Sequence, residues 1–287
     1  MRVGLVGGRG YIGEFLQKEL LQLSKIEQVQ MWDKKKSGDT LYMDLEHLEN
    51  FDFSNLSQVD CIIILAAVSS PDVCARDFES SWRINVEGTI TLISAAIERS
   101  IRVLFFSSDA VFGPDTNIFY EDSETNASTA YGKMKKVIED TFKANSLFKA
   151  IRLSYVVSSS DRFIRYCLDC IKKGSTADVY HPFYRNCITV TNVVEIVVWL
   201  LLHWDTYSSW VLNAAGSELV SRLRLADELN RILEGRLQYL VRYPGDEFYT
   251  NRPAITQMKS KFLYELEIIP ELSFSEAFRI EMQGVLE

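Results

Sequence analysis

The sequence has no excess of basic residues: 31 Lys and Arg stand against 39 Asp and Glu, for a net charge of −8. A nucleic-acid surface needs a basic stripe, so this class of partner is not expected. An anionic ligand would instead be bound by a few local groups, either backbone N–H groups or individual arginine side chains. With 47% hydrophobic and 24% charged residues, the composition is that of a soluble globular protein.

Cysteines are also too few for a disulfide framework. There are five, an odd number in a chain that is not small: Cys61, Cys74, Cys167, Cys170 and Cys187. Cys61 lies in an apolar run and is expected in the core. Cys167 and Cys170 form a C-x-x-C without a second ligand pair at zinc spacing. We therefore favour two small apolar residues on a helix over a metal or redox site, and expect no metal.

Long hydrophobic runs are missing as well. The longest, 193–202, contains Glu195 and is too short to span a bilayer, so it predicts a buried helix. The N-terminus runs directly into a strand and a glycine turn instead of a signal-peptide core. We expect a cytoplasmic protein without a membrane partner.

The first half of the chain alternates apolar strands with helical patterns. Strands are expected at 2–7, 29–33, 61–68, 102–108 and 148–157, and helices from residue 11 and over 84–99 and 130–145. This alternation predicts an α/β fold with a Rossmann-type, doubly wound parallel sheet.

The pattern loosens after residue 157. A capped helix ending at Gly174 is expected, followed later by short helices in 251–268 and 273–287. We assign 1–157 to a dinucleotide-binding domain and 158–287 mainly to a smaller, interleaved substrate lobe. Parts of 188–214 are expected to return to the main sheet.

A glycine turn, G-x-x-G-x-x-G, joins the first expected strand to the first helix. In this context glycines permit a sharp turn, a close approach to pyrophosphate and close helix–strand packing, while the helix N-terminus offers free N–H groups. The turn therefore predicts dinucleotide binding. The residues expected there are Gly7, Arg9, Gly10, Tyr11, Ile12 and Gly13.

Asp33 follows Gly13 by twenty residues and ends the second expected strand. An acid at this place bonds the adenosine ribose hydroxyls and repels a 2′-phosphate, which favours NAD(H). Arg9 and the lysines at 34–36, Lys34 first among them, offer partners for a 2′-phosphate, which leaves NADP(H) open. A solvated turn is the simpler interpretation of the lysine run.

Tyr131 and Lys135 are four residues apart, on one face of an expected helix. Taken alone, the pair fits an ordinary exposed helix surface. Ser108, however, ends the fourth clear strand about twenty residues earlier, at the edge where ligands bind in such sheets. Serine, tyrosine and lysine in this arrangement form a constellation suited to hydride transfer coupled to proton transfer.

With these residues the chain resembles an extended short-chain dehydrogenase/reductase of the nucleotide-sugar-modifying type, closest to the dTDP-4-dehydrorhamnose reductase family. The resemblance runs through "SSDAVF", "LAAV", "RINVEGT", "IRLSYVV" and a late "RP". It implies further cofactor contacts at Asp44, Leu45, Ala66, Ala67, Val68 and Asn85. It also implies that Tyr131 transfers the proton, assisted by Lys135, while Ser108 holds the reacting oxygen.

Asp109 and Ala110 help to choose among relatives. Dehydratases of this type usually carry Asp then Glu at these places, and epimerases usually lack the aspartate. Ala110 therefore disfavours dehydration, and Asp109 favours the reductases. The residues expected at the substrate are Ser69, Ser108, Asp109, Ala110, Val111, Tyr155, Arg185 and Arg252. For the last three, structural pairing is an equal alternative.

These observations predict an NAD(P)H-dependent reductase of a 4-keto (deoxy)sugar nucleotide, in nucleotide-sugar and cell-surface polysaccharide biosynthesis. A nucleotide-sugar epimerase that retains NAD is the first alternative. A non-catalytic, cofactor-binding regulatory subunit is the second, because a fold does not guarantee activity. A homodimer is the expected assembly.

Overall fold

The computed structural model describes residues 1–36, 38–115 and 117–283. The end of the tail predicted as helical, 284–287, lies outside these residues. The chain divides into two compact units, each described by itself. Unit 1 is Met1–Phe112, Thr125–Arg152 and Leu200–Leu212, and unit 2 is Gly113–Glu124, Leu153–Trp199 and Asn213–Glu287.

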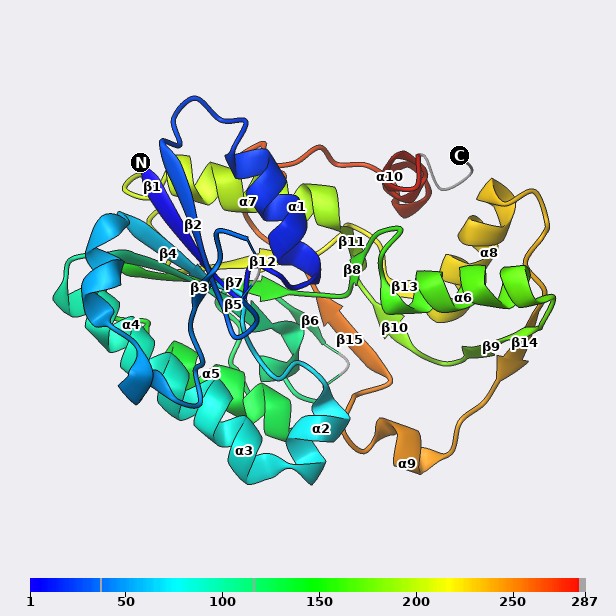
Figure 1. Ribbon diagram of the computed structural model, residues 1–287. Coiled ribbons are helices and arrows are strands. Elements are labelled where there is room, and N and C mark those ends of the chain that lie inside the picture. The colour runs from blue at the N-terminus through cyan, green and yellow to red at the C-terminus, as the bar shows by residue number, and fades with distance from the viewer. Residues whose placement is uncertain (37, 116, 284–287) are drawn as a thin grey trace. The chain divides into compact units, whose positions relative to one another are not determined.

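A seven-stranded sheet forms the centre of unit 1 (Figure 1). Its strands are β1 (Arg2–Val6), β2 (Gln28–Asp33), β3 (Leu41–Tyr42), β4 (Cys61–Ile64), β5 (Arg102–Ser108), β7 (Phe148–Leu153) and β12 (Val211–Ala214). The order is β12-β7-β5-β4-β1-β2-β3, and the pairs formed by β1, β2, β3, β4 and β5 are parallel. The predicted Rossmann-type sheet is confirmed. Its chain order reverses beside β1, the place where such sheets bind ligands.

Helices cover both faces of this sheet. In Figure 1, α1 (Tyr11–Leu20) lies on one face, and α4 (Thr89–Glu98) and α5 (Ala130–Phe142) lie on the other. Two short helices, α2 (Pro71–Arg76) and α3 (Phe78–Trp82), lead into a π-helical turn at Arg83–Gly88 before α4. Strands covered on both faces carry continuous apolar runs, and Ile62, Phe105 and Phe148 are accordingly buried.

Two predicted strands end earlier than expected. The run 61–68 is a strand only to Ile64, because the N–H groups of Leu65 and Ala66 both turn to the carbonyl of Val6. The run 148–157 breaks after Leu153, and Val156–Val157 form a separate strand, β8, paired with β11 (Ile188–Thr189). Hydrophobicity alone does not mark where a strand leaves its sheet.

Unit 2 contains a four-stranded sheet in the order β13 (Val220–Ser221), β10 (Tyr184–Arg185), β15 (Ile255–Met258) and β6 (Ile118–Phe119). A second pair joins β9 (Ala177–Tyr180) to β14 (Tyr239–Arg242). Its helices are α6 (Arg162–Lys173), most of α7 (Val190–Leu202), α8 (Arg222–Ile232), α9 (Asp246–Tyr249) and α10 (Phe274–Glu281).

The predicted capped helix is confirmed as α6, which is capped by the side chain of Asp161 and ends at Gly174 in the left-handed region. Cys167 and Cys170 lie buried on this helix, in the core of unit 2. The prediction of short helices in 251–268 is wrong at Ile255–Met258, which is strand β15. Its alternate residues are buried, a period of two that the polar neighbours obscured.

Two stretches of the chain interleave the units in sequence. Residues 113–124 belong to unit 2, although they fall inside the span 1–157. Residues 200–212 belong to unit 1, and β12 is an edge strand of its sheet. Between them in sequence, Val190–Leu202 forms helix α7, with Val193, Ile196 and Val197 buried. No helix among the described residues is long and apolar enough to span a membrane.

Candidate active site

The glycine turn packs too tightly for side chains at two of its positions. A Cβ on Gly7, whose φ is +80°, would lie 2.7 Å from the backbone of Ala66 at the end of β4. A Cβ on Gly13 would lie 2.4 Å from the carbonyl oxygen of Gly8. The turn therefore brings the end of β1 and the start of α1 into direct backbone contact.

Helix α1 begins at Tyr11, and its N-cap, Gly10, supplies no side-chain cap to the first N–H groups. Tyr11 and Ile12 are half-buried in the first turn. The N–H groups of a helix N-terminus beside a bare glycine backbone fit a pyrophosphate. These residues would hold the phosphates of a dinucleotide.

Asp33 stands at the end of β2, next to this turn. Its carboxylate accepts the backbone N–H groups of Arg9 at 3.3 Å and Lys35 at 3.0 Å. The Nε atom of Arg9 donates to Thr40 at 3.2 Å, so the arginine lies along the same loop. The carboxylate of Asp33 and the side chain of Arg9 therefore lie on neighbouring segments at the end of β2.

Lys34 is exposed, as expected of a solvated turn, and its Nζ atom pairs with Asp44 at 2.9 Å. Burial opposes ionisation of Asp44, but the bonds from Lys34 and the Glu46 N–H outweigh it and lower the pKa of the carboxyl group. The side chain of Asp44 is 5% exposed. Lys34 and Asp44, both predicted at the adenosine of the cofactor, thus form an ion pair with each other.

The segment 66–68 is held by a buried amide. Asn85, in the π-helical turn, accepts the N–H of Val68 at 2.8 Å and donates to its carbonyl at 3.0 Å. The thiol of Cys74 also donates to that carbonyl, at 3.1 Å. A Cβ on Gly88 would lie 1.9 Å from the carbonyl oxygen of Leu45. The predicted residues Leu45, Ala66, Ala67, Val68 and Asn85 thus sit on neighbouring segments of unit 1.

The serine turn and the tyrosine helix make direct contact. Ser108 ends β5, donates to Asp109 at 3.1 Å and accepts the N–H of Ala110 at 3.2 Å. A Cβ on Gly132 would lie only 2.1 Å from the carbonyl oxygen of Ala110. This contact fixes Tyr131, the preceding residue of α5, beside the Ser108 turn.

Lys135 lies one helical turn after Tyr131 and is 4% exposed. Its Nζ atom donates to the carbonyl of Phe106 at 2.7 Å and lies 5.7 Å from the centroid of the Tyr131 ring. Burial lowers the pKa of the ammonium group to about 8, against the opposing charges of Cys74 and Glu139. The pair is therefore an internal one, and not an exposed helix surface.

Tyr131 is held in its protonated form. Burial, reinforced by the carboxylate of Asp109, raises the pKa of the phenol above its usual value of about 10. A neutral phenol next to a hydrogen-bonding serine is suited to giving a proton to an oxygen that gains charge.

A buried network that the sequence did not reveal supports these residues. Glu139, one turn beyond Lys135, accepts hydrogen bonds from Ser107 at 2.5 Å and from Arg152 Nη2 at 2.8 Å. Both charged side chains are 2% exposed. Positions 131, 135 and 139 of α5 thus face consecutive residues at the end of β5. The four-residue spacing places Glu139 on the same helix face as Lys135, and this much could be read from the sequence. Only the structure shows that Arg152 pairs with Glu139.

Comparison with known proteins agrees with this geometry. The profile of the NAD dependent epimerase/dehydratase family matches residues 3–214, which contain the glycine turn, Ser108, Tyr131 and Lys135. The chain belongs to this family. The family is NAD-dependent, and membership alone does not separate reductases from epimerases.

Two similar curated proteins are an epimerase and a polysaccharide biosynthesis protein. The UDP-glucose 4-epimerase of Rhizobium meliloti (strain 1021) is 28% identical over 159 residues, 52% of this chain and 48% of the relative. The chain thus spans about half the length of that relative. The spore coat polysaccharide biosynthesis protein SpsK of Bacillus subtilis (strain 168) is 23% identical over 79% of this chain and 80% of its own.

A similar fold is seen in the dTDP-4-dehydrorhamnose reductase from Yersinia enterocolitica. The TM-score is 0.81 at 18% identity, and the match covers 98% of each chain. At this identity the likeness concerns the fold of the family.

The other residues predicted at the substrate are divided between the units. In unit 1, Ser69 is exposed after β4, whereas Val111 is buried. In unit 2, the Tyr155 hydroxyl donates to Asp161 at 2.9 Å, and Arg185 donates to the carbonyls of Tyr184 and Pro253 at 2.6 and 2.8 Å. The guanidinium of Arg252 lies 4.8 Å from the Phe248 ring centroid. Tyr155 and Arg185 thus make the structural pairings that were the alternative.

Proposed function

We propose that the protein is an NAD(P)H-dependent reductase of a 4-keto (deoxy)sugar nucleotide. One observation carries the proposal: the carbonyl of Ala110, in the turn with Ser108 and Asp109, packs against Gly132 beside Tyr131, and Lys135 lies buried one helical turn further along α5. The arrangement offers one proton donor, and residue 110 lacks the carboxylate that elimination of water would use.

The residues act on the proton and the oxygen. NAD(P)H, when bound, supplies the hydride. Ser108 donates a hydrogen bond to the substrate carbonyl and orients it toward Tyr131. Tyr131 gives its phenolic proton to the carbonyl oxygen, which becomes the hydroxyl of the product. Lys135, when protonated, stabilises the phenolate that remains.

We propose NAD(H) as the preferred cofactor. The carboxylate of Asp33 lies at the end of β2, and a 2′-phosphate there would meet its negative charge. Lys34 is paired with Asp44, which leaves Arg9, Lys35 and Lys36 as alternative partners for a phosphate. We further propose that unit 1 binds the cofactor and that unit 2 carries the substrate lobe.

A nucleotide-sugar epimerase with retained NAD is the second candidate. The match to a UDP-glucose 4-epimerase favours it. An epimerase returns its cofactor to the starting state, so its substrate conversion consumes no NADH.

The test measures product and cofactor together. The protein is incubated with a panel of 4-keto-6-deoxy nucleotide sugars and with NADH or NADPH, and the reaction is followed by absorbance at 340 nm and by NMR. We expect one reduced cofactor to disappear for each sugar reduced. Conversion of a nucleotide sugar without stoichiometric loss of NADH would overturn the reductase in favour of the epimerase.

A further inference from the structure

One buried ion pair contacts the residues on both sides of the turn that carries Ser108. Glu139 of α5 and Arg152 of β7 form this pair, with Arg152 Nε 3.0 Å from one carboxylate oxygen and Nη2 2.8 Å from the other. Just before the turn, Ser107 donates to Glu139 at 2.5 Å. Just after it, the ring centroid of Phe112 lies 4.9 Å from the central carbon of the guanidinium. The two ends of the turn are therefore joined through a single pair of side chains.

The surroundings of this ion pair favour one orientation of the guanidinium. Besides the ring after the turn, the ring of Trp210 lies 5.4 Å from the central carbon of Arg152. Ring faces attract the cation, and the two-point bond to Glu139 sets the plane of the fork. Because both charged side chains are buried, their attraction is screened little by salt. Such a pair can fix the position of the groups that it contacts.

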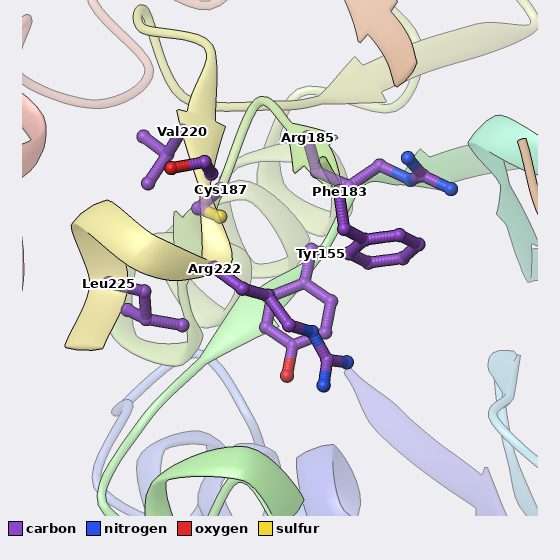
Figure 2. A pocket seen from close by; sticks show the side chains of 8 residues that line it. Tyr155, Phe183, Arg185, Cys187, Val220, Arg222 and Leu225 are labelled. Atoms are coloured by element: carbon purple, nitrogen blue, oxygen red, sulfur yellow. The ribbon is translucent and has the colours of Figure 1, made fainter. Parts of the chain in front are cut away.

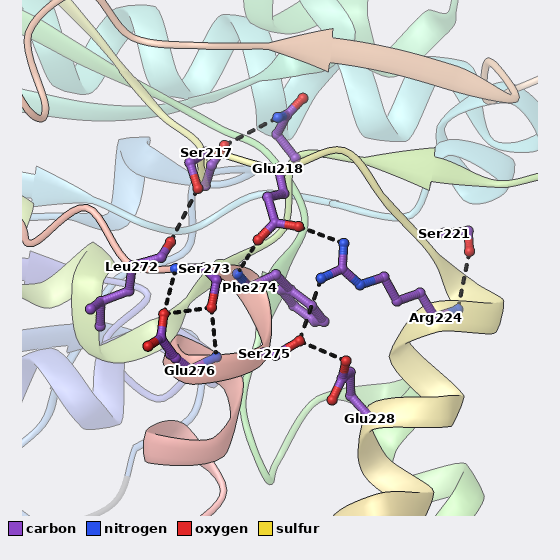
Figure 3. Close-up of polar contacts among 12 residues, drawn as sticks. Ser217, Glu218, Ser221, Arg224, Glu228, Leu272, Ser273, Phe274, Ser275 and Glu276 are labelled. Atoms are coloured by element: carbon purple, nitrogen blue, oxygen red, sulfur yellow. Dashed lines mark hydrogen bonds and ion pairs between the residues drawn. The ribbon is translucent and has the colours of Figure 1, made fainter.

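The arginines of unit 2 are associated with helix ends instead. In the pocket of Figure 2, Arg222 lies among aromatic rings. Burial raises the pKa of Asp161, the cap of α6, and the charge of Arg222 opposes that rise. Arg224 pairs with Glu218 at 2.5 Å, and Glu218 accepts the N–H of Phe274 at the start of α10 (Figure 3). The pair of unit 1 differs, because it contacts the segment that carries a proposed reacting group.

We propose that Glu139 and Arg152 are positioning residues, which together fix the Ser108 hydroxyl for its hydrogen bond to the substrate oxygen. They act through the residues that flank the turn. A reacting group displaced by about 1 Å can slow a reaction by about 100-fold, so a hydroxyl that must align with an incoming carbonyl needs this support. The inference rests on the proposed function for the reaction that is affected. The contact of the ion pair with the turn does not depend on it.

Removing both charges together separates positioning from stability. Glu139→Leu alone leaves Arg152 buried without its counter-charge. In the double variant Glu139→Leu/Arg152→Met no charge is left uncompensated, so its urea midpoint should lie closer to that of wild type than the midpoint of the single variant does. Turnover should not recover with stability. We expect kcat to fall by at least about tenfold while KM for NADH stays within about twofold of wild type.

The matched control removes an ion pair at the other end of the same strand. Arg102, the first residue of β5, pairs with Asp205 at 2.8 Å. The double variant Arg102→Met/Asp205→Leu makes the same two kinds of substitution and should keep the kcat of wild type. Equal falls of kcat in the two double variants would overturn the proposal. Recovery of turnover together with stability in Glu139→Leu/Arg152→Met would also overturn it, because the role of the pair would then be structural alone.

A milder variant covers the case in which the double variant does not fold. Ser107→Ala removes the hydroxyl that joins the turn to Glu139 and leaves the ion pair in place. We expect kcat to fall by about three- to tenfold, which corresponds to the loss of one hydrogen bond, with an unchanged KM for NADH. A kcat equal to that of wild type would refute the proposal.

Nuclear magnetic resonance of an alanine methyl in the turn tests the positioning without turnover. With ¹³C-methyl alanine in the full chain, the Ala110 signal is assigned by its loss in Ala110→Gly. We expect this signal to shift and broaden in Glu139→Leu/Arg152→Met and to stay in place in Arg102→Met/Asp205→Leu. An unmoved Ala110 signal in both would refute the proposal. A shifted signal supports the contact with the turn even if no reductase activity is found, whereas reductase activity with an unchanged kcat refutes only the positioning role.

Discussion

The two units hold their polar groups in different ways. In unit 1, the proposed catalytic residues come from strand ends and from one face of α5, and close backbone contacts such as Gly132 against Ala110 fix them. In unit 2, the predicted contacts Tyr155 and Arg185 are bonded to their own unit, while the guanidinium of Arg222, not predicted, lies among the rings of three aromatic side chains. The spacing of residues in the sequence predicts a site that backbone packing holds in place. It does not predict a site that is formed by side chains from separate elements.

The largest expected effect falls on Tyr131. Tyr131→Phe removes the proton donor while keeping the ring, so turnover should fall by about 100- to 10,000-fold. Fold and NADH affinity should stay as in wild type, measured by circular dichroism and fluorescence titration. Activity within a few-fold of wild type would mean that the chemistry of unit 1 has been misassigned.

The buried ion pair of unit 1 can be set against an exposed one of unit 2. Glu139→Gln leaves Arg152 buried without its counter-charge, and should lower the free energy of unfolding by about 3–5 kcal/mol. Glu218→Gln, which breaks the half-exposed pair with Arg224, should cost about 1 kcal/mol or less. Urea unfolding of both variants measures the difference. Equal losses in the free energy of unfolding would contradict the expected difference between the two ion pairs.

Two glycine substitutions compare a closely packed position of unit 1 with an open position of unit 2. In Gly132→Ala the new Cβ must displace the Ala110 carbonyl, so we expect a loss of about 1–3 kcal/mol in stability and a clear fall in turnover. In Gly174→Ala nothing lies within 4 Å of the new Cβ, and only the left-handed backbone is strained, by about 1 kcal/mol. Turnover in this second variant should stay unchanged, and a loss there would show that the two positions are not distinct.

The smallest expected effect concerns cofactor choice. Asp33→Asn removes the negative charge at the ribose position and should narrow the preference for NADH over NADPH by about tenfold, or about 1.4 kcal/mol. Asp39→Asn makes the same charge change at an exposed position in the following loop and should have no effect. Fluorescence titration with both cofactors provides the measurement. If wild type binds NADPH more tightly, Arg9 outweighs Asp33.

The sequence was most informative where backbone geometry dictates residue type. The apolar strands, the glycine turn and the capped helix ending at Gly174 were predictable, because each depends on local periodicity or on local backbone constraints. The surroundings of Tyr131 and Lys135 followed from their spacing and from Ser108. These patterns act over a few residues, within one strand, turn or helix.

The failures have a common physical cause. Strand β15 was taken for helix, and β4 and β7 were drawn too long, because hydrogen-bond partners distant in sequence decide where a strand ends. The pairing of Arg152 with Glu139 and the ring cluster around Arg222 likewise join residues from separate elements. No local pattern reports such contacts.

The path of the chain has a consequence for its synthesis. Unit 1 is built from three separate pieces, and the last of them, Leu200–Leu212, follows residues 153–199 of unit 2 in the chain. The sheet therefore lacks its edge strand β12 until late in translation, with one side of β7 open to wrong partners. Neither unit can be completed on the ribosome before the other has begun, so folding of this chain depends on its final third.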